Sequence, residues 1–132
     1  MGPSLMETLF GTENYTLAKT LLDAAELRHQ ALSSNLANAE TPGYRRVDLS
    51  VDFEKELQQA VRKGGGAEAI AQVRPSIEHD PSAQAMRADG NNVSIENELL
   101  QINRNTMEYE YLSRYVSDSI KGLKRAITGR NI

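Results

Sequence analysis

Two long stretches of the chain, one towards each end, carry apolar or small residues at alternating steps of four and three. The first stretch runs from about residue 12 to 39, and its repeating positions are Ala18, Leu22, Ala25, His29, Leu32, Leu36 and Ala39. The second runs through the last third of the chain, at Ile95, Leu99, Ile102, Thr106, Tyr109, Ser113, Val116, Ile120, Leu123 and Ile127. Such heptad spacing is typical of helices that pack along one another. We therefore predict a mainly α protein whose long N- and C-terminal helices form a coiled-coil-like pair.

The second of these helices has clear signals at both ends. Ser94 stands where an N-cap belongs, Glu96 and Glu98 fall in the first turn, and Gly129 offers a C-cap. Between these signals the helix could run for about 35 residues, or about 50 Å at 1.5 Å per residue. A small protein cannot bury the seam of so long a helix against its own core. We therefore expect part of both seams to pack against neighbouring copies.

The middle of the chain, residues 41–93, has a different pattern. Apolar residues alternate with polar ones at Val47, Leu49, Val51 and Phe53, as in a half-buried strand or extended segment. A short helix is predicted over residues 52–63, closed by the glycines at 64–66. Residues 64–93 are rich in Gly, Ala, Pro, Ser and Asp, which predicts a flexible loop with a few extended residues around 70–77. One domain thus divides into a core helix (1–40), a junction and loop-rich middle (41–93) and a second core helix (94–132).

The first helix ends in an unusual segment, Asn35-Leu36-Ala37-Asn38-Ala39-Glu40-Thr41-Pro42-Gly43-Tyr44. Pro42 restricts Thr41 to extended backbone and so ends the helix. Pro42 and Gly43 suit the two central positions of a type II turn, where glycine accepts a positive φ. The two asparagine amides can bond either to this helix end or to another chain. A helix-ending proline, a glycine turn and two amides in one segment indicate a junction that sets the angle between the helix and the following chain.

Composition narrows the classes of function. The 132 residues are 39% hydrophobic and 5% aromatic, which suits one domain with a modest core. Fifteen basic residues against 18 acidic ones give a net charge of −3, which argues against nucleic acid as a partner. There is no cysteine and no apolar run of membrane-spanning length. The first residues lack the basic and apolar regions of a cleaved signal peptide, so we expect any export to follow another route.

Candidate catalytic and metal-binding residues are weak. His29 lies on the heptad seam, and the polar run at 78–80 around His79 has no second cluster to complete a metal site. The glycines at 64–66 lack the Gly-Lys-Ser/Thr ending of a phosphate loop, and the serine pair at 33–34 has no evident base. Arg45 and Arg46 alone are too few for a basic patch. We expect no catalytic residue, metal, cofactor or small-molecule substrate.

The junction segment resembles the N-terminal signature of bacterial flagellar rod and hook proteins, with Asn35, Asn38, Thr41-Pro42 and Tyr44 at the characteristic spacing. Near the other end, Asp89-Gly90-Asn91-Asn92-Val93, followed by Glu98, resembles the segment that leads into the C-terminal helix of the proximal rod subunit. Ser94 stands where that subunit commonly has an aspartate, and both are good N-caps. A sister rod protein of similar size is the closest alternative within the family.

The resemblance implies a structural subunit of the flagellar basal body, exported by the flagellar type III apparatus into the periplasmic rod. In such proteins the terminal helices pack as the inner core of the rod. The packing residues would be Leu22, Leu32, Leu36, Leu99, Ile102, Tyr109, Val116, Ile120 and Leu123. Implied partners are further copies, other rod proteins, the inner-membrane ring protein and the export-junction protein FliE. The alternative is a coiled-coil adaptor or secretion chaperone of a type III system, which would share the heptads but not need the junction.

Overall fold

Helices dominate a computed structural model that describes residues 5–83 and 87–129. The two long helices, of 33 and 34 residues, confirm the predicted helical pair. In chain order the elements are α1 (Leu5–Ala37), β1 (Val47–Leu49), α2 (Val51–Arg62), α3 (Gly66–Ala71), β2 (Ile77–His79) and α4 (Ile95–Thr128). No helix in the described ranges combines the length and apolarity needed to cross a membrane.

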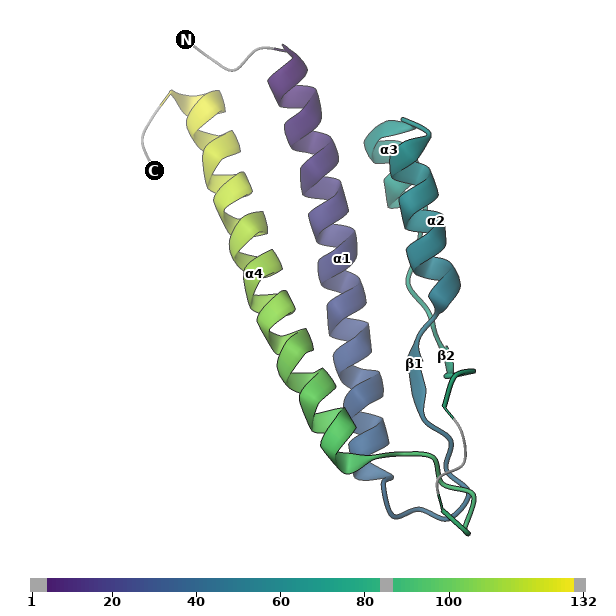
Figure 1. Ribbon diagram of the computed structural model, residues 1–132. Helices are drawn as coiled ribbons and strands as arrows, with labels where there is room; N and C mark the ends of the chain where they lie inside the picture. Colours follow the sequence, from purple (N-terminus) through teal and green to yellow (C-terminus); the bar gives the residue numbers. More distant parts are fainter. Residues whose placement is uncertain (1–4, 84–86, 130–132) are drawn as a thin grey trace.

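Figure 1 shows α1 in the middle of the molecule, with α4 along one side and the α2–α3 pair along the other. The long helices run antiparallel, so the start of α1 and the end of α4 lie at the same end of the molecule. At the opposite end the chain leaves α1, passes through the middle region and returns to enter α4. Residues 38–46 and 87–94, far apart in sequence, therefore meet at this end.

The apolar core lies between α1 and the α2–α3 pair. Ala24 of α1, Phe53 and Leu57 of α2, and Ile70 of α3 form one buried cluster. Phe53 and Leu57 are four residues apart, so they share a helix face and reach the core together. Ile70 is fully buried, which holds the short α3 against its neighbours.

The β1–β2 pair is antiparallel, with Val47 opposite His79 and Leu49 opposite Ile77. The strand is shorter than the alternating pattern suggested, because Ser50 caps the next helix by accepting a hydrogen bond from the Asp52 amide at 3.3 Å. Val51 therefore starts α2 instead of continuing the strand.

The segment after α2 is more regular than the predicted loop. No helix was predicted where α3 begins, at the last glycine of the run, and the extended residues predicted around 70–77 only partly overlap β2. Both elements depend on distant partners, α3 on the core cluster and β2 on β1. The glycines supply a change of direction, since Gly64 and Gly66 have φ values of 67° and 75°.

The two predicted seams differ in burial. On α1, Ala18, Ala25 and Leu32 are buried, Leu22 and Leu36 are partly buried, and His29 is exposed. The last predicted seam residue, Ala39, is buried but lies in the turn after α1, because the helix ends at Ala37. On α4 the seam is mostly outside: Ile102, Ser113 and Val116 are partly buried, whereas Ile95, Leu99, Thr106, Tyr109, Ile120, Leu123 and Ile127 are exposed. The buried positions of α4 are instead Glu98, Asn105 and Leu112, a row of seven-residue steps displaced by one position. Among the described residues, seven of the ten seam positions of α4 are therefore exposed.

Candidate assembly junction

The two segments that carry the flagellar resemblance lie against each other. The Gly43 amide donates a hydrogen bond to the Asp89 carbonyl at 2.8 Å. A β-carbon added to Gly90 would lie 3.7 Å from the Gly43 α-carbon. Both glycines have a positive φ, 73° at Gly43 and 83° at Gly90, a conformation that side chains disfavour. The two turns thus meet through backbone at a point where glycine is the natural residue.

Asn91 joins these turns through its side chain. It is fully buried, and its amide nitrogen donates to the carbonyls of Asn38, Ala39 and Thr41 at 3.1, 3.1 and 2.8 Å. Its amide oxygen accepts the Val93 N–H at 2.8 Å. Carbonyls at the end of a helix lack intrahelical partners. Asn91 lies in the segment that enters α4, and its amide therefore supplies hydrogen bonds to the carbonyls at the end of α1.

The turn after α1 has the predicted form. The Tyr44 amide donates to the Thr41 carbonyl at 3.2 Å across Pro42 and Gly43, and Gly43 has the positive φ that this turn requires. Asn38 donates to the Ser34 carbonyl at 2.9 Å and accepts the Thr41 hydroxyl at 3.1 Å. Its side chain thus ties the turn to the last turn of α1.

Asn35 makes the deepest contacts of the junction. Its amide nitrogen donates to the Val47 carbonyl at 2.8 Å, and its amide oxygen accepts the Val47 N–H at 2.9 Å. The Tyr44 hydroxyl donates to the same oxygen at 3.0 Å. This fully buried side chain pairs with β1 as a neighbouring strand would. The amides of Asn35 and Asn38 therefore bond within their own chain, which answers the question left open by the sequence.

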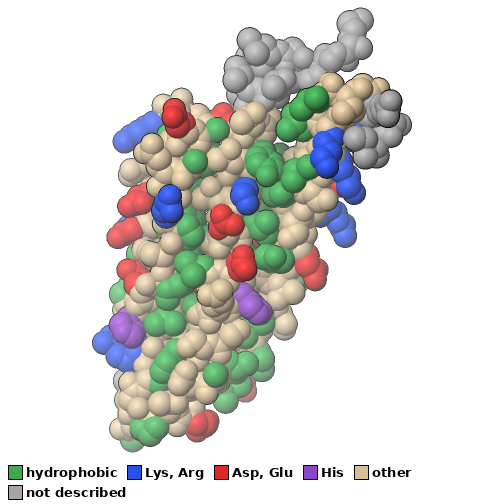
Figure 2. All heavy atoms as spheres, turned by 180° about the vertical axis from the view of Figure 1, so that it is seen from behind, with side chains coloured by type: hydrophobic (Ala, Val, Ile, Leu, Met, Phe, Trp, Pro, Cys, Tyr) green, Lys and Arg blue, Asp and Glu red, His purple; other side chains and the backbone are tan. Residues whose placement is uncertain are grey.

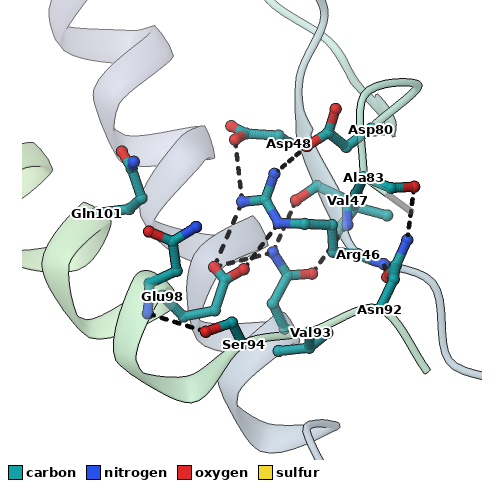
Figure 3. A network of polar contacts seen from close by, with 12 residues as sticks. Arg46, Val47, Asp48, Asp80, Ala83, Asn92, Val93, Ser94, Glu98 and Gln101 are labelled. Atoms are coloured by element: carbon teal, nitrogen blue, oxygen red, sulfur yellow. Dashed lines mark hydrogen bonds and ion pairs between the residues drawn. The ribbon is translucent and has the colours of Figure 1, made fainter. Parts of the chain in front are cut away.

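A charged cluster, centred on Arg46 and drawn in Figure 3, lies next to Asn35 through Glu98, which both residues contact. The Arg46 guanidinium bonds Glu98 of α4 at 2.7 Å, Asp80 at 2.5 Å and Asp48 of β1 at 3.1 Å. Glu98 is 1% exposed and also accepts from Asn35 at 3.3 Å. A buried carboxylate is costly unless it is paired and hydrogen-bonded, and Glu98 is both. Arg46 thus fixes the start of α4 to both strands.

The charges of this cluster reinforce one another. Burial alone would lower the pKa of the Arg46 guanidinium, but the hydrogen bonds and charges of its acidic partners raise that pKa above its usual value. Burial would raise the pKa of Asp48, yet hydrogen bonds from Arg28 and the Leu49 amide hold it below its usual range. The pKa of Asp80 is likewise lowered, by Ser82 and Arg46 against the effect of burial. All three groups are held in their charged forms.

Arg28 extends the cluster to the middle of α1. Its guanidinium bonds Asp48 at 2.9 Å and the Gln101 side chain of α4 at 2.9 Å. Asn92, in the segment before α4, accepts the Arg46 backbone N–H at 2.7 Å. Polar contacts therefore connect α1, both strands and α4 through one continuous network.

Comparison with known proteins identifies the family. No family model matches the chain. The flagellar basal body rod protein FlgB of Escherichia coli K12 is 31% identical over 120 residues, which cover 79% of this chain and 85% of that protein. FlgB of Aquifex aeolicus is 34% identical over 116 residues, 86% of this chain and 92% of that protein. FlgB of Aeromonas hydrophila is 29% identical over 129 residues, 91% and 92% respectively. The chain belongs to the FlgB family of flagellar rod proteins.

Membership of the FlgB family confirms the resemblance seen in the sequence and decides between the two rod subunits considered there. It makes the chain a structural flagellar protein and does not favour the adaptor or chaperone alternative. The junction residues proposed from the sequence all lie at the end of the molecule where α1 ends and α4 begins. They are Asn35, Asn38 and Thr41 to Tyr44 on one side, and Asp89 to Ser94 on the other. Ser94 is the N-cap of α4, accepting the Asn97 N–H at 3.4 Å.

The charged cluster was not predicted from the sequence. Arg46 stands there as half of an arginine pair, and no local pattern connects it with Glu98 or Asp80. One signal is present in the sequence: Arg46 and Asp48 stand on either side of Val47 in an extended segment, so both side chains fall on the same face, one directly before β1 and one within it. A second missed residue is Arg87, which donates to the Ala39 carbonyl and pairs with Glu40 at 3.4 Å.

The histidines stand apart from this network. His29 and His79 are both exposed and lie well separated on the face shown in Figure 2. Across the described residues, no three histidine, aspartate or glutamate side chains converge as a metal site would require. The chemistry of the FlgB-family junction is therefore that of amides, backbone groups and ion pairs.

Proposed function

We propose that this chain is a structural subunit of the flagellar basal-body rod that assembles helically through its two long helices. One observation carries the proposal: the predicted seam of α4 faces outward. Leu99, Tyr109 and Leu123 of this seam are 46%, 40% and 56% exposed. An exposed apolar row along a long helix is typical of a protein interaction surface. Neighbouring subunits would bury it.

The junction would set the geometry of this assembly. Asn91 and the Arg46 cluster tie the end of α1 and the start of α4 to the middle region. Because these contacts are buried and mutually satisfied, they hold the helix pair at a fixed angle to the rest of the subunit. A rod built from many copies repeats this angle at every contact, so a small change in it would accumulate.

The junction proposal is tested with Asn38→Ala and Pro42→Ala. Both positions lie at the surface or partly exposed, so we expect expression and export to remain largely intact. Loss of the Asn38 bonds or of the proline turn should impair rod assembly and therefore swimming. Gln59→Ala, at an exposed position on α2 outside both the junction and the seam of α4, serves as the control and should swim normally. Normal motility of both junction variants would contradict the proposal.

The wider assembly follows from the family. We propose that the subunit contacts other rod proteins, and at the rod base the inner-membrane ring protein and FliE, after export through the flagellar type III apparatus. Purified basal bodies should contain the chain. Deleting it should stop assembly at the inner-membrane ring, before any rod forms. Basal bodies that lack the chain, or complete rods without it, would refute its role as a rod subunit.

A further inference from the structure

In the part of the chain that the structure describes, β2 is the outer strand of a sheet that has only two strands. The other edge of the sheet is closed, because the Asn35 side chain pairs with Val47 of β1. Figure 1 shows β2 on the side of β1 that faces away from α1. The free edge of the sheet is therefore the outer edge of β2.

The hydrogen bonds between the strands show which groups of β2 lie on this edge. Ser76 accepts a backbone hydrogen bond from Ser50 at 2.8 Å, and Asp80 donates one to the carbonyl just before β1 at 3.1 Å. Residues of an antiparallel strand alternate between bonding the neighbouring strand and facing away from it. Ile77 and His79 therefore direct their N–H and C=O groups outward. None of these groups has a hydrogen-bond partner among the described residues.

Prolines limit the length of the free edge. The next residues in the same alternation are Pro75 and Pro81, and proline has no N–H to donate. Prolines at a sheet edge discourage long strand pairing. The edge therefore fits a strand of about three residues, whose first and third residues would pair with Ile77 and His79.

On one face of the sheet, the side chain beside this edge is acidic. Glu78 lies between the two outward residues, is exposed and forms no ion pair with another described residue. Its neighbour on β1, Asp48, is already paired with Arg28 and Arg46. Opposite charges on neighbouring strands stabilise a sheet. A basic middle residue would therefore be favoured on an incoming strand.

The other face of the sheet is mainly apolar. Val47 and Leu49 of β1 lie opposite His79 and Ile77, and Leu49 packs against the core cluster. A side chain placed next to Ile77, which is partly buried, would extend this apolar surface. The first and third residues of an incoming strand would therefore be apolar.

A second copy of β2 does not meet these requirements. Two antiparallel β2 strands can use both donors of each strand only in the register that places Ile77 opposite His79. That register places Glu78 directly opposite Glu78 of the other copy, and like charges in this position are destabilising. A segment that carries the opposite charge fits the edge better.

We propose that the outer edge of β2 binds an extended strand of a different protein, with a basic residue between two apolar residues. The strand would join the sheet through the N–H and C=O groups of Ile77 and His79, as in other cases of strand addition. Glu78 would pair with the basic residue. This contact goes beyond the proposed rod function, because the edge is complete in one subunit. In the flagellum the partner would be another basal-body protein.

A short peptide tests the edge on the isolated full-length chain. Acetyl-Thr-Val-Lys-Val-Thr-amide at millimolar concentration should shift the amide resonances of Ile77 and His79 in nuclear magnetic resonance spectra. Replacing its lysine by glutamate should weaken binding by about fivefold, because the new side chain would face Glu78. Methylating the backbone nitrogens of both valines removes the bonding N–H groups and should abolish binding. No shift with the lysine peptide, or equal shifts with the methylated one, would overturn the proposal.

Two substitutions at one position isolate the backbone donor. His79→Pro removes the outward N–H, whereas His79→Thr keeps this N–H and changes only the side chain. Because the N–H has no partner among the described residues, both variants should unfold at similar urea concentrations. Only the proline variant should lose the lysine peptide, and equal binding by both variants would overturn the proposal.

Charge reversal gives a test that does not depend on the proline variant. Glu78→Lys should reverse the preference of the edge, so that the glutamate peptide binds more tightly than the lysine peptide. Glu56→Lys, at an exposed position on α2 away from the strands, should keep the original preference. An unchanged preference in Glu78→Lys would overturn the proposal.

Photo-cross-linking in isolated basal bodies tests the partner. With p-benzoylphenylalanine in place of His79, the chain should link to a different protein, at a segment with a basic residue between two apolar residues. The same photo-cross-linker in place of Glu56 should not give this product. Links only between copies of this chain, or none in basal bodies that contain it, would overturn the proposal and leave the rod function standing. Absence of the chain from basal bodies would refute the rod function, and the peptide experiment would then decide the edge contact by itself.

Discussion

Asn35 shows how one side chain can replace a backbone partner. Both polar groups of its amide pair with Val47, so β1 gains on this side the hydrogen bonds that a strand would have supplied. The side chain comes from the last turn of a helix, where the backbone N–H groups are already used within the helix and cannot pair with a strand. An amide is the group that can donate and accept in this geometry.

We predict that Asn35→Ala destabilises the fold by about 2–5 kcal/mol, because it leaves the N–H and C=O of Val47 without partners in a buried site. Urea unfolding followed by circular dichroism measures this loss. Asn103→Ala, at an exposed position on α4, should change the free energy of unfolding by about 0.5 kcal/mol or less. Equal effects of the two substitutions would contradict the role assigned to Asn35.

Asn105 presents the opposite case. It is 2% exposed and donates to the Ala25 carbonyl at 2.8 Å, but its amide oxygen has no partner in the described structure. A half-satisfied buried amide contributes little, and an apolar residue of similar shape can replace it at small cost. We predict that Asn105→Leu changes the free energy of unfolding by about 1 kcal/mol or less, in either direction. A loss as large as that of Asn35→Ala, in the same urea experiment, would contradict this.

At the scale of elements, the charged cluster should make the attachment of α4 to the strands sensitive to acid. The pKa values of Asp48 and Asp80 are held below the usual 3.8. Carboxylates with lowered pKa values stabilise the fold above their unfolded-state pKa and lose that contribution as the pH falls through the folded-state value. We therefore expect the urea midpoint to fall as the pH drops below about 4.

Asp48→Asn separates this effect from general acid denaturation. The variant has one fewer carboxylate to protonate, so its urea midpoint should be lower at neutral pH and fall less steeply between pH 4 and pH 2. Ser82→Ala removes one of the hydrogen bonds that lower the pKa of Asp80 and should shift the acid transition upward. Parallel pH profiles for Asp48→Asn and the unaltered chain would contradict the role of the cluster.

Elements also differ in how well the sequence predicts them. The ends of α4 were predictable because Ser94 and Gly129 act on neighbouring backbone groups. The turn at Pro42 and Gly43 was predictable for the same reason. By contrast, α3 depends on the burial of Ile70 against α1 and α2, and β2 depends on a strand 30 residues earlier. The sequence pattern around α3 or β2 does not include these distant partners, so it could not predict either element.

At the junction, too, the local features could be predicted from the sequence and the contacts between distant residues could not. Both junction segments were recognisable in the sequence, but nothing local indicated that the Asn91 side chain would close the end of α1. The pairing of Arg46 with Glu98 joins residues 52 positions apart. On α4, the row through Leu99 and the adjacent row through Glu98 have the same period, so only the packed structure shows which one faces α1.

At the scale of the whole molecule, contacts are concentrated at the junction end. Leu32, Asn35 and Glu98 are almost fully buried, whereas on α4 beyond Leu112 every described residue is exposed or only partly buried. Backbone hydrogen bonds open most easily where few buried groups support them. We predict that in the free monomer hydrogen exchange is slowest around residues 31–35 and 98–105 and fastest along residues 113–128.

Hydrogen exchange of dilute protein, read by mass spectrometry, measures this gradient. The same residues 113–128 should become protected in isolated basal bodies, where neighbouring copies cover them. Circular dichroism of the dilute monomer should show less helix than the full length of α1 and α4 would give. Uniform, strong protection of both long helices in a proven monomer would contradict the prediction.

The closing of the junction by Asn91 also bears on how much the middle region can vary in size. The chain leaves α1 near Asn38 and returns to the same point at Asn91, so residues between them form an excursion with its ends tied together. Lengthening such an excursion far from its base, for instance at Gly65, costs only a slowly growing loop entropy. The helix pair would keep its register, and a label or a small domain could be carried on the outside of the subunit without a change in its packing surfaces.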